Sequence, residues 1–172
     1  MGAEVVAHEW PGTQAEQFNW ALDNLPIKTE WVLRLDADEY LTEALIEELK
    51  TCVPSLPSHV TGLVFPRYNL FLGKRMRRGT GAIKILRMFR RGKAVSEPRL
   101  MDEHICLLEG ESYECGSFFV DHNLNEIGIW TDKHNNYALR EAVEMLDLEY
   151  GLLEGSNARV AGWFKGESKK EK

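Results

Sequence analysis

The sequence predicts an α/β fold in which a mixed sheet is flanked by helices. Short apolar runs of strand length alternate with segments whose apolar residues recur at helical spacing, the pattern typical of this class. The chain has 172 residues, of which 44% are hydrophobic, enough to bury the core of one domain. We therefore expect one domain over residues 1–164 and a charged, frayed tail over 165–172.

The N-terminal part resembles a β-α-β unit, from which parallel sheets are built. We expect a short strand over Glu4–His8 and a helix that Thr13 caps and that extends to about Asn24. Pro26 ends this helix, and a second strand is expected over Trp31–Asp36.

The remaining elements follow from the same signals. Thr42 begins a second helix, with Leu45, Ile46 and Leu49 directed inward. Strands are expected at 62–68, 83–89 and 117–121, with a hairpin or loop at 69–74. A helical pattern covers 125–153, broken near residues 131–132. Its expected inward positions are Ile127, Trp130, His134, Tyr137, Ala138, Val143 and Leu146.

Three carboxylates follow the second predicted strand within four positions: Asp36, Asp38 and Glu39. Strand side chains alternate between faces, so Asp36 and Asp38 are expected to point the same way, about 6–7 Å apart. A divalent cation relieves such repulsion, and oxygen ligands suit Mg²⁺ or Mn²⁺ shared with a substrate's phosphates. The alternative is a solvated acidic turn ahead of a helix, whose N-terminus favours negative charge.

Charge is distributed unevenly along the chain. Residues 67–99 contain eleven Lys or Arg and one acid, a local charge of +10 in a chain of net charge −6. This basic strip suits an anionic lipid-linked acceptor or an acidic membrane surface, and the alternative is a solvated strand face. The three cysteines (Cys52, Cys106 and Cys115) lack metal-binding spacing, and their odd number argues against a full disulfide framework. Both observations favour reduced thiols and a cytoplasmic location.

Four motifs occur in order along the chain. The first is Leu35-Asp36-Ala37-Asp38-Glu39, and the later ones are Met101-Asp102-Glu103-His104, Val120-Asp121-His122-Asn123 and Trp130-Thr131-x-Lys133-His134-Asn135-x-Tyr137-Ala138. Together they resemble family 2 glycosyltransferases, in particular a bacterial branch that builds lipopolysaccharide core or exopolysaccharide. The resemblance covers about residues 5–163. It implies a GT-A-like (Rossmann-like) fold and transfer of a sugar, with inversion, from a UDP- or GDP-sugar to a saccharide or lipid-linked saccharide.

The resemblance also implies roles for the acidic cluster. Asp38 is expected to ligate Mg²⁺ or Mn²⁺, and Asp36 to contact the donor's ribose or the metal. His122 is either a third metal ligand or a contact to the diphosphate, because neutral imidazole is a good ligand for Mn²⁺. A satisfied structural histidine is the alternative.

Further residues are candidates for binding the donor and for the chemistry. Lys133 and His134 lie at the start of a helix, where a cation and backbone N–H groups meet phosphate, and Arg75 of the basic strip is a third contact to the donor. An inverting transferase needs a base for the acceptor hydroxyl, for which Glu103 and Asp102 are the candidates. We favour Glu103. The alternative is core packing for His134 and a solvated side chain for Lys133. For Asp102 and Glu103 it is a pair of surface acids beside a strand.

The chain departs from the family at both ends. The Pro-x-Tyr-Asn-Glu and Asp-Ser-x-Ser-Thr-Asp segments that hold the donor nucleotide are absent, and relatives continue into a basic, membrane-associated part. We therefore expect a fragment that lacks the N-terminal nucleotide-binding strands and the C-terminal part. Its expected location is the cytoplasm, with peripheral contact to the inner face of the bacterial plasma membrane.

Three other readings stay open. An aspartyl phosphatase also places Asp-x-Asp at a strand end, with Asp36 as nucleophile, but it expects Thr or Val where Tyr40 stands. A module binding nucleic acid or another anionic polymer would use the basic strip with its aromatics, although the acidic remainder argues against nucleic acid. The third is an inactive fragment of a transferase.

Overall fold

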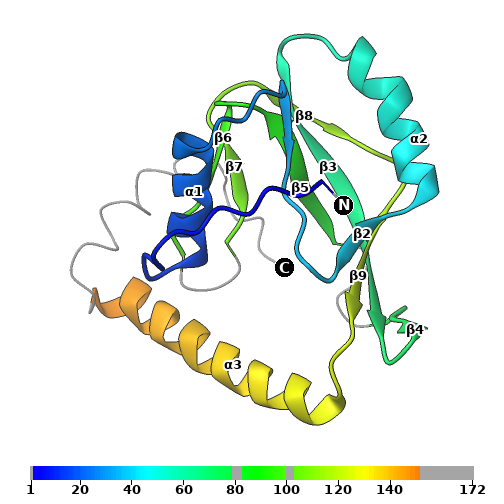
Figure 1. Ribbon diagram of the computed structural model, residues 1–172. Helices are drawn as coiled ribbons and strands as arrows, with labels where there is room; N and C mark the ends of the chain where they lie inside the picture. Colours follow the sequence, from blue (N-terminus) through cyan, green and yellow to red (C-terminus); the bar gives the residue numbers. More distant parts are fainter. Residues whose placement is uncertain (1, 79–82, 100–102, 152–172) are drawn as a thin grey trace.

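The computed structural model describes residues 2–78, 83–99 and 103–151 (Figure 1). The helices are α1 (Gln14–Asn24), α2 (Glu43–Cys52), a short 3-10 helix η1 (Val53–Ser55) and α3 (Ile127–Tyr150). The strands are β1 (Trp31–Leu33), β2 (Glu39–Leu41), β3 (Val60–Phe71), β4 (Lys74–Arg75), β5 (Lys84–Arg90), β6 (Ala94–Ser96), β7 (Ile105–Leu107), β8 (Glu111–Glu114) and β9 (Phe119–Asn123). The predicted tail, 165–172, lies outside the described residues.

The principal sheet is mixed, as predicted. Its strands follow the order β1-β5-β3-β9-β2, and β4 and β8 also pair with β3. The long strand β3 runs parallel to β8 and β9 and antiparallel to β4 and β5. Strands β6 and β7 form a separate antiparallel pair. The sheet and its flanking helices confirm the predicted α/β class.

Helices α1 and α2 begin at the predicted caps. The Thr13 hydroxyl oxygen accepts from Glu16 N–H at 3.2 Å, and that of Thr42 accepts from Leu45 N–H at 3.3 Å. The Thr42 hydroxyl also donates to the Phe118 carbonyl at 2.7 Å. Each cap satisfies an N–H that has no partner within its helix.

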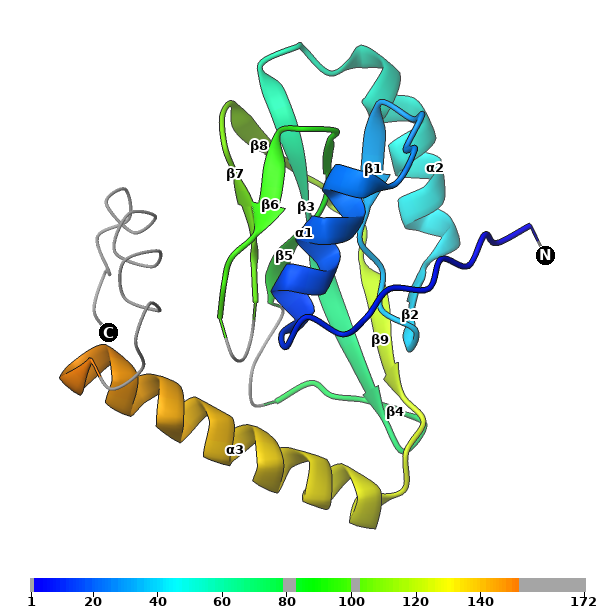
Figure 2. The same cartoon turned by 60° about the vertical axis from the view of Figure 1, so that its left-hand side comes forward.

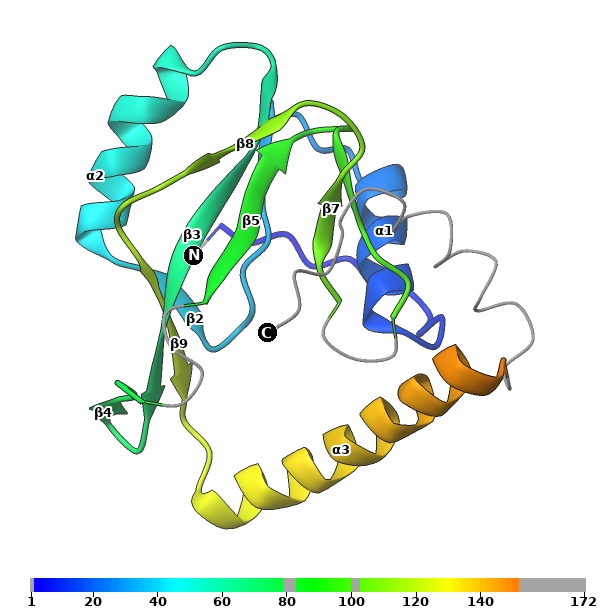
Figure 3. The ribbon, with the colours of Figure 1, turned by 180° about the vertical axis from the view of Figure 1, so that it is seen from behind.

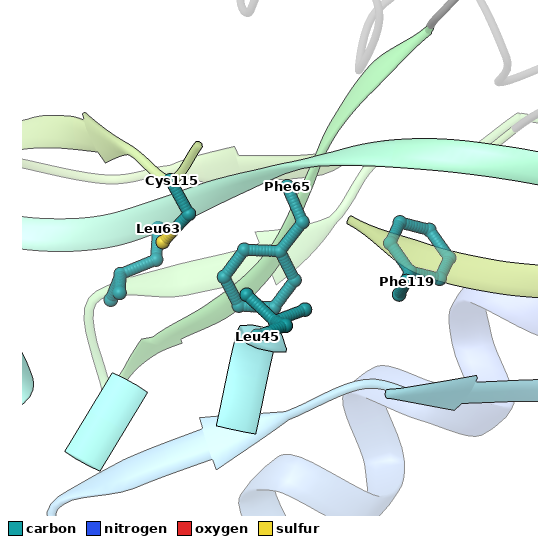
Figure 4. Packing of buried hydrophobic residues seen from close by; sticks show 5 residues of the cluster. All are labelled: Leu45, Leu63, Phe65, Cys115 and Phe119. Atoms are coloured by element: carbon teal, nitrogen blue, oxygen red, sulfur yellow. The ribbon is translucent and has the colours of Figure 1, made fainter. Parts of the chain in front are cut away.

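The core has two parts, one on each face of the sheet. Leu45 of α2 packs with four buried residues of the sheet region, shown in Figure 4: Leu63, Phe65, Cys115 and Phe119. On the other face, Phe18 and Leu22 of α1 pack against Phe89, Ala94 and Ile105. Ile46 was predicted to face inward, but it is exposed, because α2 directs Leu45 and Leu49 into the sheet instead.

The predicted strand Glu4–His8 is absent. This segment has no strand pairing, and Val5 is 91% exposed. Contacts to α1 hold its end: His8 stacks on Trp20 at 3.7 Å between ring centroids, and its Nδ1 lies 2.8 Å from Gln17 Oε1. The predicted parallel β-α-β unit is therefore wrong, because its first strand is absent and its second, β1, pairs antiparallel with β5 (Figure 2).

The predicted strand Trp31–Asp36 is shorter than expected. Strand β1 ends at Leu33, and the chain turns at residues 37–38 before β2 begins. The Glu39 N–H donates to the Asp36 carbonyl at 3.0 Å and closes this turn. Asp36 and Asp38 therefore belong to a turn and not to a straight strand.

Helix α3 is continuous from Ile127 to Tyr150, so the predicted break at 131–132 is wrong. It runs beneath one end of the sheet, from the end of β9 toward α1 (Figures 1 and 3). Of its predicted inward residues only Trp130 and Tyr137 are half-buried, because this helix crosses the end of the sheet and not its face. Among the described residues, no helix is long and apolar enough to cross a membrane.

Glu48 of α2 stabilises the loop before β9. Its carboxylate accepts from the N–H groups of Gly116 and Ser117 at 2.8 and 2.7 Å. Burial raises the pKa of Glu48, but these hydrogen bonds outweigh burial, and the pKa is lowered overall. The native state therefore favours the ionised form, and its contribution to stability is present at neutral pH and is lost as the pH falls through the lowered pKa.

We expect Glu48→Gln to lower the free energy of unfolding by about 1 kcal/mol at neutral pH, because two N–H donors lose a charged acceptor. The difference from the parent should shrink as the pH falls, and urea denaturation at a series of pH values measures it. Glu47→Gln is the control, because Glu47 forms only an exposed pair with Lys50. Equal effects of the two substitutions would contradict the role of Glu48.

Candidate functional site

A cleft of about 1030 Å³ lies where the β1–β2 turn, strands β3 and β5, the segment before β7 and helix α3 meet. Three carboxylates line it: Asp36, Asp38 and Glu103. More numerous basic side chains share its walls: Arg34, Arg67, Lys84, Arg87, Arg99, Lys133 and Arg140. The excess of positive charge suits a ligand with several negative charges.

The structure brings four of the predicted site residues into this cleft: Asp36, Asp38, Glu103 and Lys133. They come from three separate parts of the chain. The first two lie in the β1–β2 turn, Glu103 precedes β7, and Lys133 lies in the second turn of α3. Asp102, the other candidate base, lies outside the described residues.

His122 is placed beside the acidic turn by its backbone. Its N–H donates to the Asp38 carbonyl at 2.8 Å, where β9 meets the turn. Its ring packs edge-on against Tyr40, with 6.4 Å between the ring centroids. The side chain is not among those that line the cleft.

Two further predicted donor contacts also lie outside the cleft lining. His134 stacks on Trp130, with ring centroids 3.7 Å apart, and its Nδ1 lies 2.7 Å from the Trp130 carbonyl oxygen. Arg75 places its guanidinium 3.1 Å from the centroid of the Tyr68 ring, on the β3–β4 hairpin. Both side chains are engaged in local stacking.

Arg87 neutralises part of the acidic turn. It is buried, and its guanidinium pairs with Glu39 and with Asp36 Oδ2 at 3.2 Å. The second oxygen of Glu39 accepts from Asp36 N–H at 3.0 Å. Burial raises the pKa of Glu39, against the lowering effects of this hydrogen bond and of Arg87. Asp36 and Glu39 thus shape the turn through a shared cation.

Asp38 carries charge that no such partner compensates. Its carboxylate forms no hydrogen bond or salt bridge within the described part of the chain. Asp121 of β9 lies close to it, half-buried, with Arg67 Nη1 at 3.6 Å. Burial raises the pKa of Asp121, and the charges of Asp38 and Asp36 raise it further, while Arg67 and Arg87 oppose them.

Sequence reasoning missed Asp121, although it belongs to one of the quoted motifs. The motif directed attention to His122, its neighbour. Because strand side chains alternate, Asp121 and His122 point to opposite faces, and Asp121 lies opposite Glu39 in the register of β2 and β9. No local signal distinguishes the two faces, because Phe119 and Val120, which point to opposite faces of β9, are both buried.

A divalent cation fits this site if a phosphate shares it. Within residues 2–78, 83–99 and 103–151, no set of three or more His, Cys, Asp or Glu side chains is arranged to hold a metal by itself. Mg²⁺, however, is commonly held by one or two carboxylates together with substrate phosphates and water. Asp38 in the cleft lining provides one such carboxylate, and Asp121, whose pKa the charge of Asp38 raises, lies beside it outside the lining.

Lys133 extends the positive wall toward these carboxylates. A hydrogen bond with Tyr137 raises its pKa, burial lowers it, and the charges of Asp38 and Asp121 raise it. The net shift is upward, so Lys133 stays protonated at neutral pH. A fixed cation from α3 thus lies near the acidic turn, where a phosphate can bridge the two.

Glu97 organises the cleft wall beside Glu103. It is buried, and its Oε1 accepts from the His104 N–H at 3.1 Å and lies 2.5 Å from His104 Nδ1. Burial raises the pKa of Glu97, but the hydrogen bonds of His104 and the charges of His104 and Arg99 outweigh it and lower the pKa. Arg99 Nε also pairs with Glu144 of α3 at 2.9 Å, which connects this wall to the helix.

Arg99 and Glu144 are 45 residues apart in the chain, so no local pattern predicted their contact. Arg34 adds another link, because its Nη1 donates to the Glu103 carbonyl at 3.3 Å. The backbone of Glu103 is thereby held near the end of β1, and the residue remains in the cleft lining.

Comparison with models of known protein families and with curated proteins finds no match for this chain.

Proposed function

We propose that the chain is the catalytic part of a metal-dependent inverting glycosyltransferase with a GT-A-like fold. The observation that carries the proposal is the convergence of Asp36, Asp38, Glu103 and Lys133 on one cleft rich in Lys and Arg. The motif resemblance to family 2 glycosyltransferases supports the same reaction. The donor is a UDP- or GDP-sugar, and the acceptor is a saccharide or a lipid-linked saccharide.

The diphosphate of the donor binds between the acidic turn and α3. Asp38, with Asp121 beside it, would hold Mg²⁺ or Mn²⁺, and Lys133 would contact the phosphates. A metal ion bound there compensates the negative charge that develops on the departing nucleoside diphosphate. Arg67 pairs with Asp121, and Arg87 pairs with Asp36 of the acidic turn, which keeps these two carboxylates in place.

Glu103 receives the proton of the acceptor hydroxyl as its oxygen attacks the anomeric carbon. The new carbon–oxygen bond forms on the face of the anomeric carbon opposite the bond to the diphosphate. The electron pair of the bond that breaks leaves with the nucleoside diphosphate. Arg34 holds the backbone of Glu103 in place. A carboxylate in this role contributes about 10²–10⁴-fold to the rate.

Asp38→Asn tests the metal role without changing the shape of the side chain. We expect titration calorimetry of the parent with UDP- and GDP-sugars to show binding that requires Mn²⁺ or Mg²⁺. The variant should bind at least about tenfold more weakly, because the loss even of groups that only support metal ligands typically costs that much.

Asp23→Asn, an exposed acid of α1, is the matched control and should bind as the parent does. Metal-dependent binding of equal strength in Asp38→Asn would reject the assigned metal role. Binding that ignores the metal but weakens steeply with salt would favour a module for anionic polymers, which the excess of cations in the cleft also suits.

A further inference from the structure

The β3–β4 hairpin has an unusual tip. Leu72 and Gly73 connect the strands, with Phe71 paired to Lys74, and both connecting residues have positive φ, 49° and 73°. Two-residue loops with positive φ at both positions belong to the type I′ class, in which Asn or Asp normally precedes Gly. Leu72 is the one non-glycine residue with positive φ in the described part of the chain. The turn therefore contains a bulky residue where a polar one is conformationally easier.

Two apolar side chains of the hairpin are largely exposed. Leu72 is 58% exposed, and Met76, four positions later, is 54% exposed. The hairpin projects from one end of the sheet, near the beginning of α3 (Figures 1 and 3). Two apolar side chains are thus more than half exposed to solvent on a protruding element.

The same hairpin is strongly basic. Lys74, Arg75, Arg77 and Arg78 are all exposed, and no acid occurs between Asn69 and Arg78. The basic strip of the sequence therefore divides in the structure. One part of it lines the cleft: Arg67, Lys84, Arg87 and Arg99. The four hairpin residues instead lie next to Leu72 and Met76 in the chain.

We propose that the β3–β4 hairpin docks on the surface of an anionic lipid bilayer. Leu72 and Met76 enter the boundary between headgroups and acyl chains, and the four basic side chains contact the negatively charged headgroups. The positive charge of the hairpin is complementary to such a surface. Moving the apolar tip from water into the acyl-chain boundary is also favourable.

A nucleic acid fits the hairpin less well than a bilayer does. Single-stranded nucleic acids bind through bases stacked on aromatic rings. Of the aromatic rings on β3 beside these cations, Tyr68 is already covered by Arg75 at 3.1 Å and by Phe118, whose ring centroid lies 3.4 Å away. Phe71 packs against Trp130, with 5.2 Å between the ring centroids. The exposed apolar groups, Leu72 and Met76, have no face on which a base can stack.

Leu72→Asn is the decisive variant, because Asn favours the turn and removes the apolar side chain. We expect the parent to co-sediment with vesicles of phosphatidylcholine and phosphatidylglycerol, but not with vesicles of phosphatidylcholine alone. Leu72→Asn should bind the anionic vesicles several-fold more weakly while its urea midpoint is unchanged or higher. Leu108→Asn, a Leu 56% exposed outside the hairpin, is the matched control and should bind as the parent does.

The charges are tested by neutralising two of them. Arg77→Gln/Arg78→Gln should reduce binding by about fivefold per residue, because each basic residue near an anionic surface contributes about that factor. Lys28→Gln, an exposed lysine elsewhere, should leave binding unchanged.

Two results would overturn the proposal. One is the absence of binding to anionic vesicles at low salt. The other is binding that Leu72→Asn leaves intact and that a single-stranded oligonucleotide abolishes, which would identify a polyanion surface. The proposal does not rest on the glycosyltransferase reaction, so donor binding and vesicle binding can succeed or fail separately.

Discussion

Arg87→Met is expected to destabilise the fold by about 3–5 kcal/mol, the cost typical of removing one partner of a buried ion pair. Glu39 then remains buried without its cation, and Asp36 loses the guanidinium at 3.2 Å. The measurement is the free energy of unfolding in urea. Burial raises the pKa of Glu39, and the loss of Arg87 removes an effect that lowers it, so the variant should recover part of the lost stability as the pH falls and Glu39 takes up a proton.

A double-mutant cycle separates the pair from the size of the side chain. Glu39→Gln/Arg87→Met should be more stable than Arg87→Met alone, since the uncompensated charge is gone and Gln can still accept from Asp36 N–H. Arg77→Met, an exposed arginine after β4, should change stability by less than about 0.5 kcal/mol. A double variant no more stable than Arg87→Met would show that Glu39 is not the source of the loss.

The second large effect is expected in catalysis. Glu103→Gln should reduce sugar transfer by about 10²–10⁴-fold and leave metal-dependent donor binding unchanged, because the amide cannot accept the proton of the acceptor hydroxyl. Donor binding is measured by calorimetry and transfer by release of the nucleoside diphosphate in the presence of acceptor saccharides. The separation of binding from turnover distinguishes a base from a residue that only shapes the cleft.

Glu109→Gln is the matched control, because Glu109 forms an exposed pair with Lys93 outside the cleft lining. His104→Gln is the competing variant, since His104 also lines the cleft and lies 2.5 Å from buried Glu97. Full turnover in Glu103→Gln with loss in His104→Gln would transfer the role of base to the histidine. Loss of donor binding in Glu103→Gln would instead assign the residue to the donor site.

Features that depend on neighbouring residues were predictable from the sequence. The caps at Thr13 and Thr42 bond to N–H groups three residues away, and the predicted helices begin there. The predicted strand at 62–68 lies within β3, and the one at 83–89 differs from β5 by one residue at each end. The predicted hairpin forms between β3 and β4. The predicted strand Glu4–His8 failed for the opposite reason. Its composition is strand-like, but a strand also needs a neighbouring strand to pair with, and this segment has none in the described structure.

The candidate site could be predicted only in part. Asp36 and Asp38 were identified because acids after an apolar strand are visible locally, and the motif order pointed to Glu103 and Lys133. Asp121, Glu97 and the cleft arginines depend on pairings between distant segments, such as Glu39 with Asp121 in the register of β2 and β9. His122 and His134 were singled out by residue type, yet their rings pack against aromatic neighbours.

The sequence by itself determined the α/β class, the helix starts and the acidic turn, since each depends on residues a few positions apart. Only the tertiary structure decided which carboxylates are paired, because Arg87 reaches the turn from β5 and pairs with Asp36 and Glu39, whereas Asp38 forms no salt bridge with any residue that the structure describes. It also divided the basic strip between the cleft and the hairpin. The physical reason is that charge and burial are properties of three-dimensional neighbourhoods, which a linear pattern does not contain.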